Sequence, residues 1–412
     1  MFKIVKHELK RQLKSKGTLI LILITLVLTA FLGYYPASYQ RIDIFEADGS
    51  VQTLKGVQAV KAIHESKKDF EGEATPEKLL EAHQRYKEVY ERYNGEITFE
   101  IDSKELRPFK ALLNILYYAQ PDIFNPGKEG FSLYELSSED VLAFYENRAA
   151  NQAAYFEDKV KLSGTALENA KSREAQVEKP FYYSSVPGWD TALEYVGMVA
   201  TMIAFMVAII AAQVFSNSYR SGEDEILRCT KLGKKQFGRA KVLATLVLTT
   251  GLYILIMALL FGINSATLGI EGLKTSIQFL DTLSPAPFTF GEIWLQSAVY
   301  GFIGILATVS LVLFISSKSK ASIFVMALSI PLIILPLLMQ FVFKVSSLGL
   351  TLISDILPTS GLNIFYSLIG GSGSLGYYGA VWSPYITAVA AIIEIGIFAM
   401  LAVQSYSRHQ AV

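Results

Sequence analysis

The sequence predicts an all-α polytopic membrane protein with six transmembrane helices and a mostly helical extracytoplasmic domain between spans one and two. Of its 412 residues, 51% are hydrophobic and 18% are charged, whereas about a quarter of an ordinary soluble domain is charged. Six mostly apolar stretches are also long enough, at about 20 residues, to cross a bilayer as helices. Lys plus Arg and Asp plus Glu number 37 each, and this zero net charge argues against a nucleic-acid partner.

The six predicted spans begin with the run TLILILITLVLTAFLGYY, which carries no charge and ends at Pro36. A cleaved signal peptide is the alternative, but this apolar core is long for one and lacks a convincing small-residue cleavage site. Trp189, Trp294 and Trp382 lie at or beside span ends, where indole rings prefer the membrane interface. The spans are residues 17–36, 191–215, 242–264, 293–316, 321–343 and 385–404.

Residues 344–384 are predicted to form a re-entrant or interfacial segment. The stretch 348–369 is apolar, but Asp355, Pro358 and Gly361 interrupt it. Irregular backbone at membrane depth needs protein around it, so two short helices are expected rather than a seventh crossing. The Gly-rich run 370–379 that follows is expected to be a flexible loop.

The distribution of Lys and Arg predicts the orientation. Sixteen of these residues lie in the first 17 residues, in residues 216–241, in the turn after span four and in the tail. Lys274 and Lys344 are the two on the opposite side, with the large domain left out. Because cytoplasmic flanks carry the excess of positive charge, both termini are predicted to be cytoplasmic, in a multi-pass protein of the plasma membrane.

Residues 37–190 form the predicted extracytoplasmic domain. The run RIDIFEADGSVQTL predicts a hairpin that turns at Asp48-Gly49, and the alternation of Ile97, Phe99 and Ile101 predicts a short strand. Helices are expected over 77–93, after Thr75-Pro76, over 103–119 and over 138–161, with Ser137 or Ser138 as a cap. The many tyrosines fit a ligand-binding face or a packed core, and the core is favoured because a single cysteine excludes an internal disulfide.

Residues 1–16 predict an amphipathic helix on the cytoplasmic side. Lys3, Lys6, Lys10 and Lys14 surround an apolar stripe, which suits a helix lying on an anionic membrane surface. The alternative is an ordinary basic flank. The stripe consists of Phe2, Val5, Leu9 and Leu13.

Residues 216–241 form a loop of unusual length. A simple connector between two helices needs about 2–8 residues, whereas the run FSNSYRSGEDEILRCTKLGKKQFGRAK is several times longer. It predicts a short helix with acidic residues at its positive end, ended by a glycine and followed by basic residues. The alternative is a solvated basic loop.

This loop resembles the one between the second and third spans of type-2 ABC exporter permeases. In that family small and acidic residues precede a short apolar helix, then come a turn, a basic residue and a lysine that opens span three. A proline often found in the turn is replaced here by Leu232-Gly233. The six spans, the basic first helix and the insertion after span one, as in Gram-positive members, also match. The residues assigned to ATPase coupling are Gly222, Glu223, Glu225, Ile226, Leu227, Gly233, Arg239 and Lys241.

The resemblance implies a permease subunit that forms half of a translocation path, beside a second copy or a paralogue. It implies a separate ABC ATPase subunit whose cleft receives the short helix, with ATP and Mg²⁺ on that partner and no cofactor on this chain. The sequence agrees, since no G-x-x-x-x-G-K-[ST] motif occurs. The transported substrate does not follow from the sequence.

Few other residues suggest chemistry. Glu394 lies deep in span six, where an acid costs roughly 2.5–3.5 kcal/mol, so it is a candidate for the translocation path or for a bond between helices. Pro331 and Pro336 should bend span five. The scattered histidines predict no metal site, and no catalytic residues are found. A membrane sensor or scaffold that signals through its extracytoplasmic domain is the alternative function, and a membrane-embedded enzyme is a weaker one.

Overall fold

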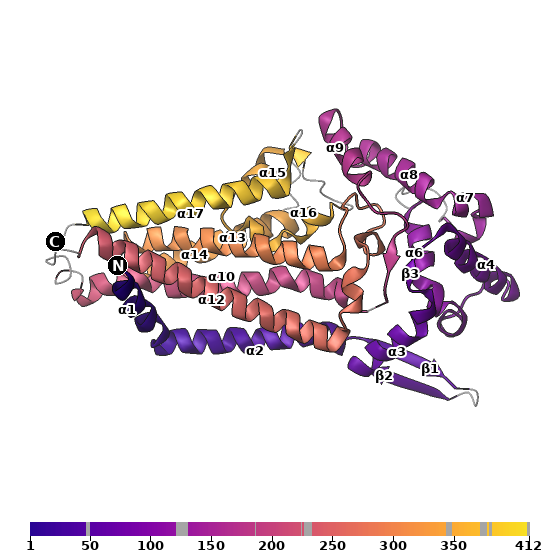
Figure 1. The fold of residues 1–412 in the computed structure, drawn as a ribbon, viewed down its shortest axis with the longest axis horizontal. Coiled ribbons are helices and arrows are strands. Elements are labelled where there is room, and N and C mark those ends of the chain that lie inside the picture. The colour runs from indigo at the N-terminus through magenta and orange to yellow at the C-terminus, as the bar shows by residue number, and fades with distance from the viewer. Residues whose placement is uncertain are drawn as a thin grey trace.

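The structure is a computed structural model in which a long bundle of helices ends in a cap of smaller elements (Figure 1). Both chain termini lie at one end of the bundle, hereafter the terminus end, and the cap lies at the opposite or far end. The described residues are 1–46, 50–120, 131–185, 187–223, 225, 233–342, 348–370, 377–378 and 381–409.

Five helices of the described part are long and apolar enough to cross a membrane. These helices are longer than the predicted spans. α10 and α12 have 33 and 34 residues, which gives about 50 Å at 1.5 Å per residue, whereas the hydrocarbon core of a bilayer is about 30 Å thick. The helices therefore continue beyond the apolar stretches at the terminus end. They are α2 (Lys16–Ser38), α10 (Trp189–Ser221), α12 (Lys235–Leu268), α13 (Phe290–Ser316) and α17 (Ser383–Arg408).

The fifth predicted span is where prediction and structure differ. Residues 321–343 were expected to form one long helix, but α14 (Ser322–Leu337) has 16 residues and passes into the π-helical turn η8 (Leu338–Val342). Pro336 has no N–H to bond the Leu332 carbonyl one turn earlier. The hydroxyl of Thr359 donates to that carbonyl at 3.2 Å instead, so a neighbouring segment supplies the lost bond.

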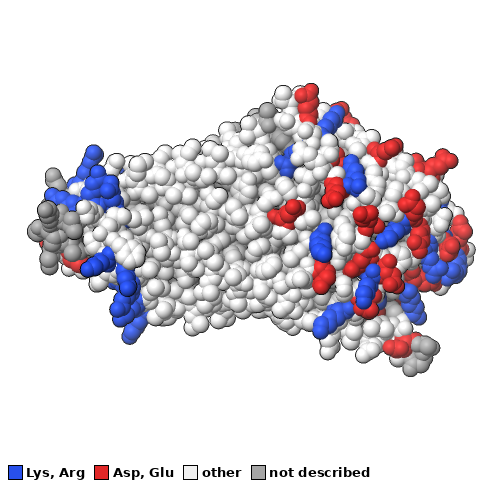
Figure 2. Space-filling view, in the orientation of Figure 1, with Lys and Arg blue, Asp and Glu red and all other residues white. Residues whose placement is uncertain are grey.

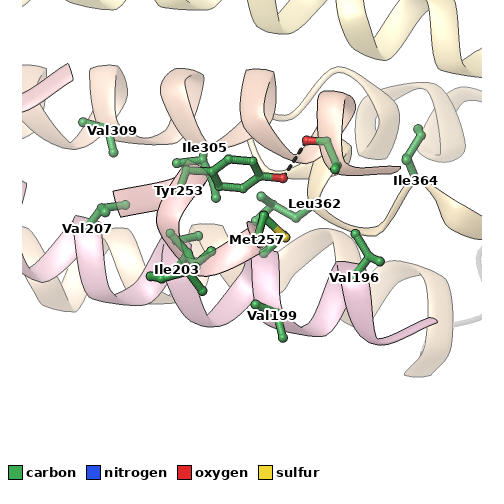
Figure 3. Close-up of a cluster of buried hydrophobic side chains, with 14 of the residues drawn as sticks. Val196, Val199, Ile203, Val207, Tyr253, Met257, Ile305, Val309, Leu362 and Ile364 are labelled. Atoms are coloured by element: carbon green, nitrogen blue, oxygen red, sulfur yellow. Dashed lines mark hydrogen bonds between the residues drawn. The ribbon is translucent and has the colours of Figure 1, made fainter. Parts of the chain in front are cut away.

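The interior of the bundle is packed with apolar side chains. Figure 3 shows one cluster where α10, α12 and α13 meet, with Ile203, Met257 and Ile305 fully or almost fully buried. Its one drawn hydrogen bond runs from the Tyr253 hydroxyl to the Ala298 carbonyl, at 2.6 Å. The buried share of the most apolar stretch is 67% in α10 and 50% in α13, but 22% in α2 and in α17. The first two are central and the last two peripheral.

The segment after α14 contains short elements, as predicted. They are α15 (Leu348–Asp355), η9 (Ser360–Asn363) and α16 (Phe365–Ile369), followed by the hairpin β5 (Tyr377–Tyr378) and β6 (Val381–Trp382). At 8 residues α15 is about 12 Å long, so no described helix here can cross a bilayer. The expectation of a flexible loop over 370–379 falls mostly on residues outside the described ones, and residues 377–378 form a strand.

The inserted region, residues 39–188, forms the cap at the far end and is mostly helical. The predicted hairpin is confirmed as β1 (Arg41–Phe45) paired antiparallel with β2 (Val51–Lys55), while its predicted turn at Asp48-Gly49 lies outside the described residues. After α3 (Val57–Lys67), η1 (Lys68–Phe70) and β3 (Gly72–Glu73), the predicted helix α4 (Pro76–Arg92) is capped by Thr75. The strand expected at 97–101 is wrong, because Thr98 caps a helical turn there, α5 (Phe99–Ile101).

The other two predicted helices of the inserted region are broken into pieces. Residues 102–118 form η2 (Asp102–Leu106), η3 (Arg107–Phe109) and α6 (Lys110–Tyr118), with a break beside Pro108. After η5 (Leu133–Glu135), a capping box of Ser137 and Asp140 starts α7 (Ser138–Leu142). The remaining elements are α8 (Phe144–Asp158), α9 (Thr165–Glu174) and β4 (Tyr182–Tyr183), which pairs with β3.

Part of the aromatic content builds the core of this region. The ring of Tyr145 lies 4.9 Å from that of Phe181, and its hydroxyl donates to the Ala74 carbonyl at 2.6 Å. Burial raises the pKa of Tyr145 to about 12. Tyr118 is exposed, so the predicted packing holds for some of the tyrosines and not for all.

Candidate functional site

The three tryptophans lie at the ends of spans, as predicted, but they are buried in protein rather than turned toward lipid. Trp189 is fully buried, and its indole donates to the Gly269 carbonyl at 2.9 Å. Trp382 precedes α17 and is 6% exposed. These rings hold segments of the far end together. The described residues that are predicted to couple to an ATPase lie at the opposite, terminus end.

At the terminus end, the predicted coupling loop leaves α10 through a sharp turn. Gly222 adopts the left-handed conformation with φ +70° and ends the helix. The N–H of Glu225 then bonds the Gly222 carbonyl at 3.1 Å. Ile226 and Leu227, the predicted apolar pair of the coupling helix, lie outside the described residues, and the chain is described again from Gly233.

Lys241 fastens the two helices that flank this loop. It is fully buried on α12, and its ammonium group donates to the Val214 carbonyl of α10 at 2.8 Å and to the Ser218 hydroxyl. The rings of Phe237 and Phe215 lie 5.2 and 5.5 Å from it. A buried cation needs such partners, so the lysine predicted to open span three clamps α12 to α10. Arg239, the other predicted basic residue, is exposed.

Hydroxyl groups join the end of α10 to the end of α13. Ser316 donates to the Ala212 carbonyl at 2.9 Å, and the Tyr219 hydroxyl donates to the Ser317 carbonyl, also at 2.9 Å. The sequence reasoning missed these residues. Their signal was weak: polar side chains placed just where an apolar stretch ends.

An aromatic group brings α17 into the same junction. Tyr406 is fully buried, with its ring 5.2 Å from that of Phe215. The imidazole of His409 stacks on Tyr219 at 4.3 Å. A Cβ on Gly238 would lie 2.8 Å from the Tyr406 ring, so α12 approaches α17 closely there. Four long helices, α10, α12, α13 and α17, thus meet beside the loop.

The first helix, α1 (Phe2–Leu13), lies against α12 and has two different sides. Along the predicted apolar stripe, Phe2 is 82% and Leu13 37% exposed, whereas Val5 and Leu9 are half-buried. The stripe therefore remains open at its ends and is available to a membrane surface. No described contact tests whether it binds one.

The other side of α1 is polar, buried and directed toward the candidate site. The Gln12 amide donates to the Thr245 hydroxyl of α12 at 3.0 Å. Arg11 pairs with the buried Glu8 at 2.7 Å and reaches Glu223, at the start of the loop, at 3.5 Å. The first helix is therefore bonded both to span three and to the predicted coupling loop.

Charge is sorted along the molecule. Figure 2 shows Lys and Arg at the terminus end, a broad band of the visible face without charged residues, and mixed charges over the inserted region. Exposed basic residues of the terminus end include Lys3, Lys6, Lys10, Lys14, Lys234 and Lys235. The uncharged band is the part expected within a bilayer.

Glu394 lies half-buried on α17, twelve residues before Tyr406 of the junction. Its Oε2 atom is buried and has no hydrogen-bond partner among the described residues. No group of His, Cys, Asp or Glu side chains that could hold a metal ion is found in the described part of the chain.

The family of the chain follows from a match over nearly its whole length. The model of the ABC-2 family transporter protein matches residues 16–403, from the start of α2 into α17. The chain belongs to this family. As an ABC-2 permease it is the non-catalytic membrane subunit of an ABC transporter, and members of the family typically pair with an ABC ATPase. A search of curated proteins finds no match.

Proposed function

We propose that this ABC-2 permease is half of an ATP-driven exporter, with its ATPase subunit docking on the loop 216–241 at the terminus end. The contacts of Lys241 support docking on this side, because Lys241 joins α10 to α12 where the loop begins and ends. A push on the loop would be transmitted to both helices. Gly222, Glu223, Glu225, Ile226, Leu227, Gly233 and Arg239 would form or frame the docking element.

Six crossings fit this arrangement better than five. α13 ends beside the end of α17, since the Ser405 hydroxyl donates to the Ser317 carbonyl at 3.4 Å. α14 must then return toward the far end, where α17 begins. Together α14 and η8 cover residues 322–342, and 21 residues at 1.5 Å each give about 30 Å, one bilayer core. With sixteen Lys and Arg on this side, the terminus end would be cytoplasmic.

The translocation path would lie between two permease subunits, a second copy or a paralogue. The interior of this chain supports that placement, because apolar side chains fill the meeting point of α10, α12 and α13 (Figure 3). Glu394 is a candidate for the wall of the path, as a carboxylate in a span needs water or a partner. ATP and Mg²⁺ would be bound by the ATPase, in the plasma membrane complex.

The test is whether the loop is required for both docking and export. An ABC ATPase should co-purify with the wild-type permease, and Glu225→Arg or Leu227→Asp should abolish co-purification and ATP-driven export. Glu77→Lys, an exposed change on α4 at the far end, is the matched control and should do neither. If both loop variants dock and export normally, the docking site is wrong.

A further inference from the structure

A buried arginine is among the residues that bond the inserted region to the bundle, beside Tyr182 and Ser184, which bond Ser276 and Thr275. Arg148 lies on α8 and is fully buried. Its Nε donates to the Thr282 carbonyl at 2.6 Å, and its Nη2 donates to the Ser284 carbonyl at 2.9 Å. Both carbonyls belong to residues 269–289, hereafter the α12–α13 loop. Arg148 also pairs with Glu174 of α9, which supplies the counter-charge.

A second residue, one turn further along α8, completes the set. The amide of Gln152 donates to the Leu283 carbonyl at 2.8 Å and to the second oxygen of Glu174 at 3.0 Å. Three consecutive carbonyls of the loop, 282 to 284, are therefore held by two side chains of one helix face. Arg148, Gln152 and Glu174 are hereafter the latch.

The latched stretch of loop has no ladder or helix of its own to fix its shape. Residues 280–288 lie between the 3₁₀ turn η7 (Ile277–Phe279) and the cap of α13. Buried carbonyls need donors, and those of residues 282 to 284 receive them from α8, while Gln278 of the loop itself also donates to the Ser284 and Ala286 carbonyls. The conformation of the connection between spans three and four thus depends in part on α8.

The opposite side of the loop is bonded to the segment before span six. The Ser284 hydroxyl donates to the Ile369 carbonyl at the end of α16. In parallel, the guanidinium of Arg173 on α9 lies 3.5 Å from the centre of the Trp382 ring, directly before α17. The first contact joins the latched loop to α16, and the second joins α9 to the residue before α17.

We propose that the latch makes the inserted region one mechanical unit with the far ends of α13 and α17, so that a force on the inserted region is transmitted to these spans. This inference does not depend on where the ATPase docks or on which side is cytoplasmic. It assigns the region a direct connection to two spans of the permease. Arg148 acts through the loop and is a positioning residue.

The test measures distances by pulsed electron spin resonance on the full chain in lipid nanodiscs, in a Cys229→Ser background. One label pair joins α9 to α13, at Ser172→Cys and Leu295→Cys, which are both exposed sites. A second pair lies within the inserted region, at Ser172→Cys and Glu81→Cys. The distance distribution of the first pair should be narrow in the parent.

Arg148→Ala combined with Glu174→Gln removes the guanidinium and the carboxylate of the latch together, so that the buried negative charge is not left without the arginine. It should at least double the width of the α9–α13 distribution and leave the internal pair unchanged. The single variant Glu174→Gln keeps Arg148 on its two loop carbonyls and should retain most of the narrow width. Arg85→Ala is the matched control, because Arg85 pairs with Glu105 at 2.9 Å wholly within the inserted region, and should change neither width.

Two results would overturn the inference. An unchanged α9–α13 width in the double variant would mean that the latch does not join the two parts. Equal broadening of both label pairs would mean that the latch only stabilises the fold of the inserted region.

Discussion

The two ends of the bundle each carry a buried cation between helices, but the two cations are held in different ways. Arg148 at the far end faces the buried carboxylate of Glu174. The described hydrogen bonds of Lys241 at the terminus end run to a carbonyl and a hydroxyl. A guanidinium with a carboxylate and two carbonyls is fixed in one geometry, and the ammonium group of Lys241 joins α10 to α12.

This difference indicates which end of the molecule is held rigidly. At the far end, side chains of the inserted region fix a stretch of loop that lacks secondary structure. At the terminus end, helices are bonded directly to helices, and the loop itself carries exposed acidic residues such as Glu223 and Glu225. An arrangement of this kind suits a permease that is rigid at one end and receives its drive at the other.

The largest expected effect tests the far end. Arg148→Ala leaves the buried Glu174 carboxylate with Lys179 as its described ion-pair partner, at 3.0 Å, so stability should fall by about 3 kcal/mol, the lower end for a broken buried pair, seen as a lower melting temperature in a fixed detergent. Arg148→Ala with Glu174→Gln should recover part of the loss, because the buried charge is then gone. Equal losses in the two variants would show that lost packing, and not the charge, dominates.

The next largest effect is expected in a pH titration, from a buried tyrosine of the inserted region at the far end. Burial raises the pKa of Tyr183 to about 12, and the nearby Glu71 carboxylate adds to the rise. Because the folded pKa exceeds the unfolded value of about 10, the neutral form is favoured in the folded state. The resulting stability, about 2–3 kcal/mol, is complete below pH 10 and is lost as the pH rises through 12.

Ultraviolet titration of tyrosine ionisation alongside unfolding measures this effect, and Tyr183→Phe should reduce the alkaline loss. Tyr182→Phe, at an exposed neighbour on the same strand, is the control. An alkaline profile that Tyr183→Phe leaves unaltered would contradict the assignment.

The spans and the first hairpin were predictable because each depends on a local pattern. A run of 20 apolar residues specifies a crossing whatever it packs against, and Asp48-Gly49 specifies a turn by itself. The short alternation at Ile97, Phe99 and Ile101 failed, because three residues do not distinguish a strand from a capped helical turn. Pro336 lies one residue before the end of α14, where the helix passes into a π-helical turn, so α14 is shorter than the predicted span.

The latch and the junction could not be predicted for a different reason. Arg148 meets carbonyls more than 130 residues away, and along its own helix it looks like any exposed arginine. The polar side of α1 was missed similarly: Glu8 and Gln12 are buried only because Arg11 and Thr245 bond them. Lys241 was singled out by resemblance, but its role as a clamp became visible only with α10 beside it.

A smaller effect should appear where helices approach one another at the terminus end. Gly238→Ala places a Cβ 2.8 Å from the buried Tyr406 ring, and such overpacking should cost about 1–3 kcal/mol. Gly251→Ala on the same helix meets nothing within 4 Å and should be neutral or stabilise by up to about 1 kcal/mol. Thermal unfolding of the two variants side by side measures the contrast, and an equal shift would show that α12 and α17 are not tightly packed there.

The smallest effect on stability is expected at Glu223, and it separates folding from coupling. Its ion pair with Arg11 spans 3.5 Å, with side chains 33% and 46% exposed, and such exposed pairs contribute about 0–1 kcal/mol and weaken with salt. Glu223→Gln should therefore leave the melting temperature nearly unchanged. A large loss of ATPase docking in that variant would have to arise at the docking surface, because the fold would be intact. A large loss of stability would instead show that α1 holds the loop in place, and the loop would then be part of the rigid body rather than the element that receives the drive.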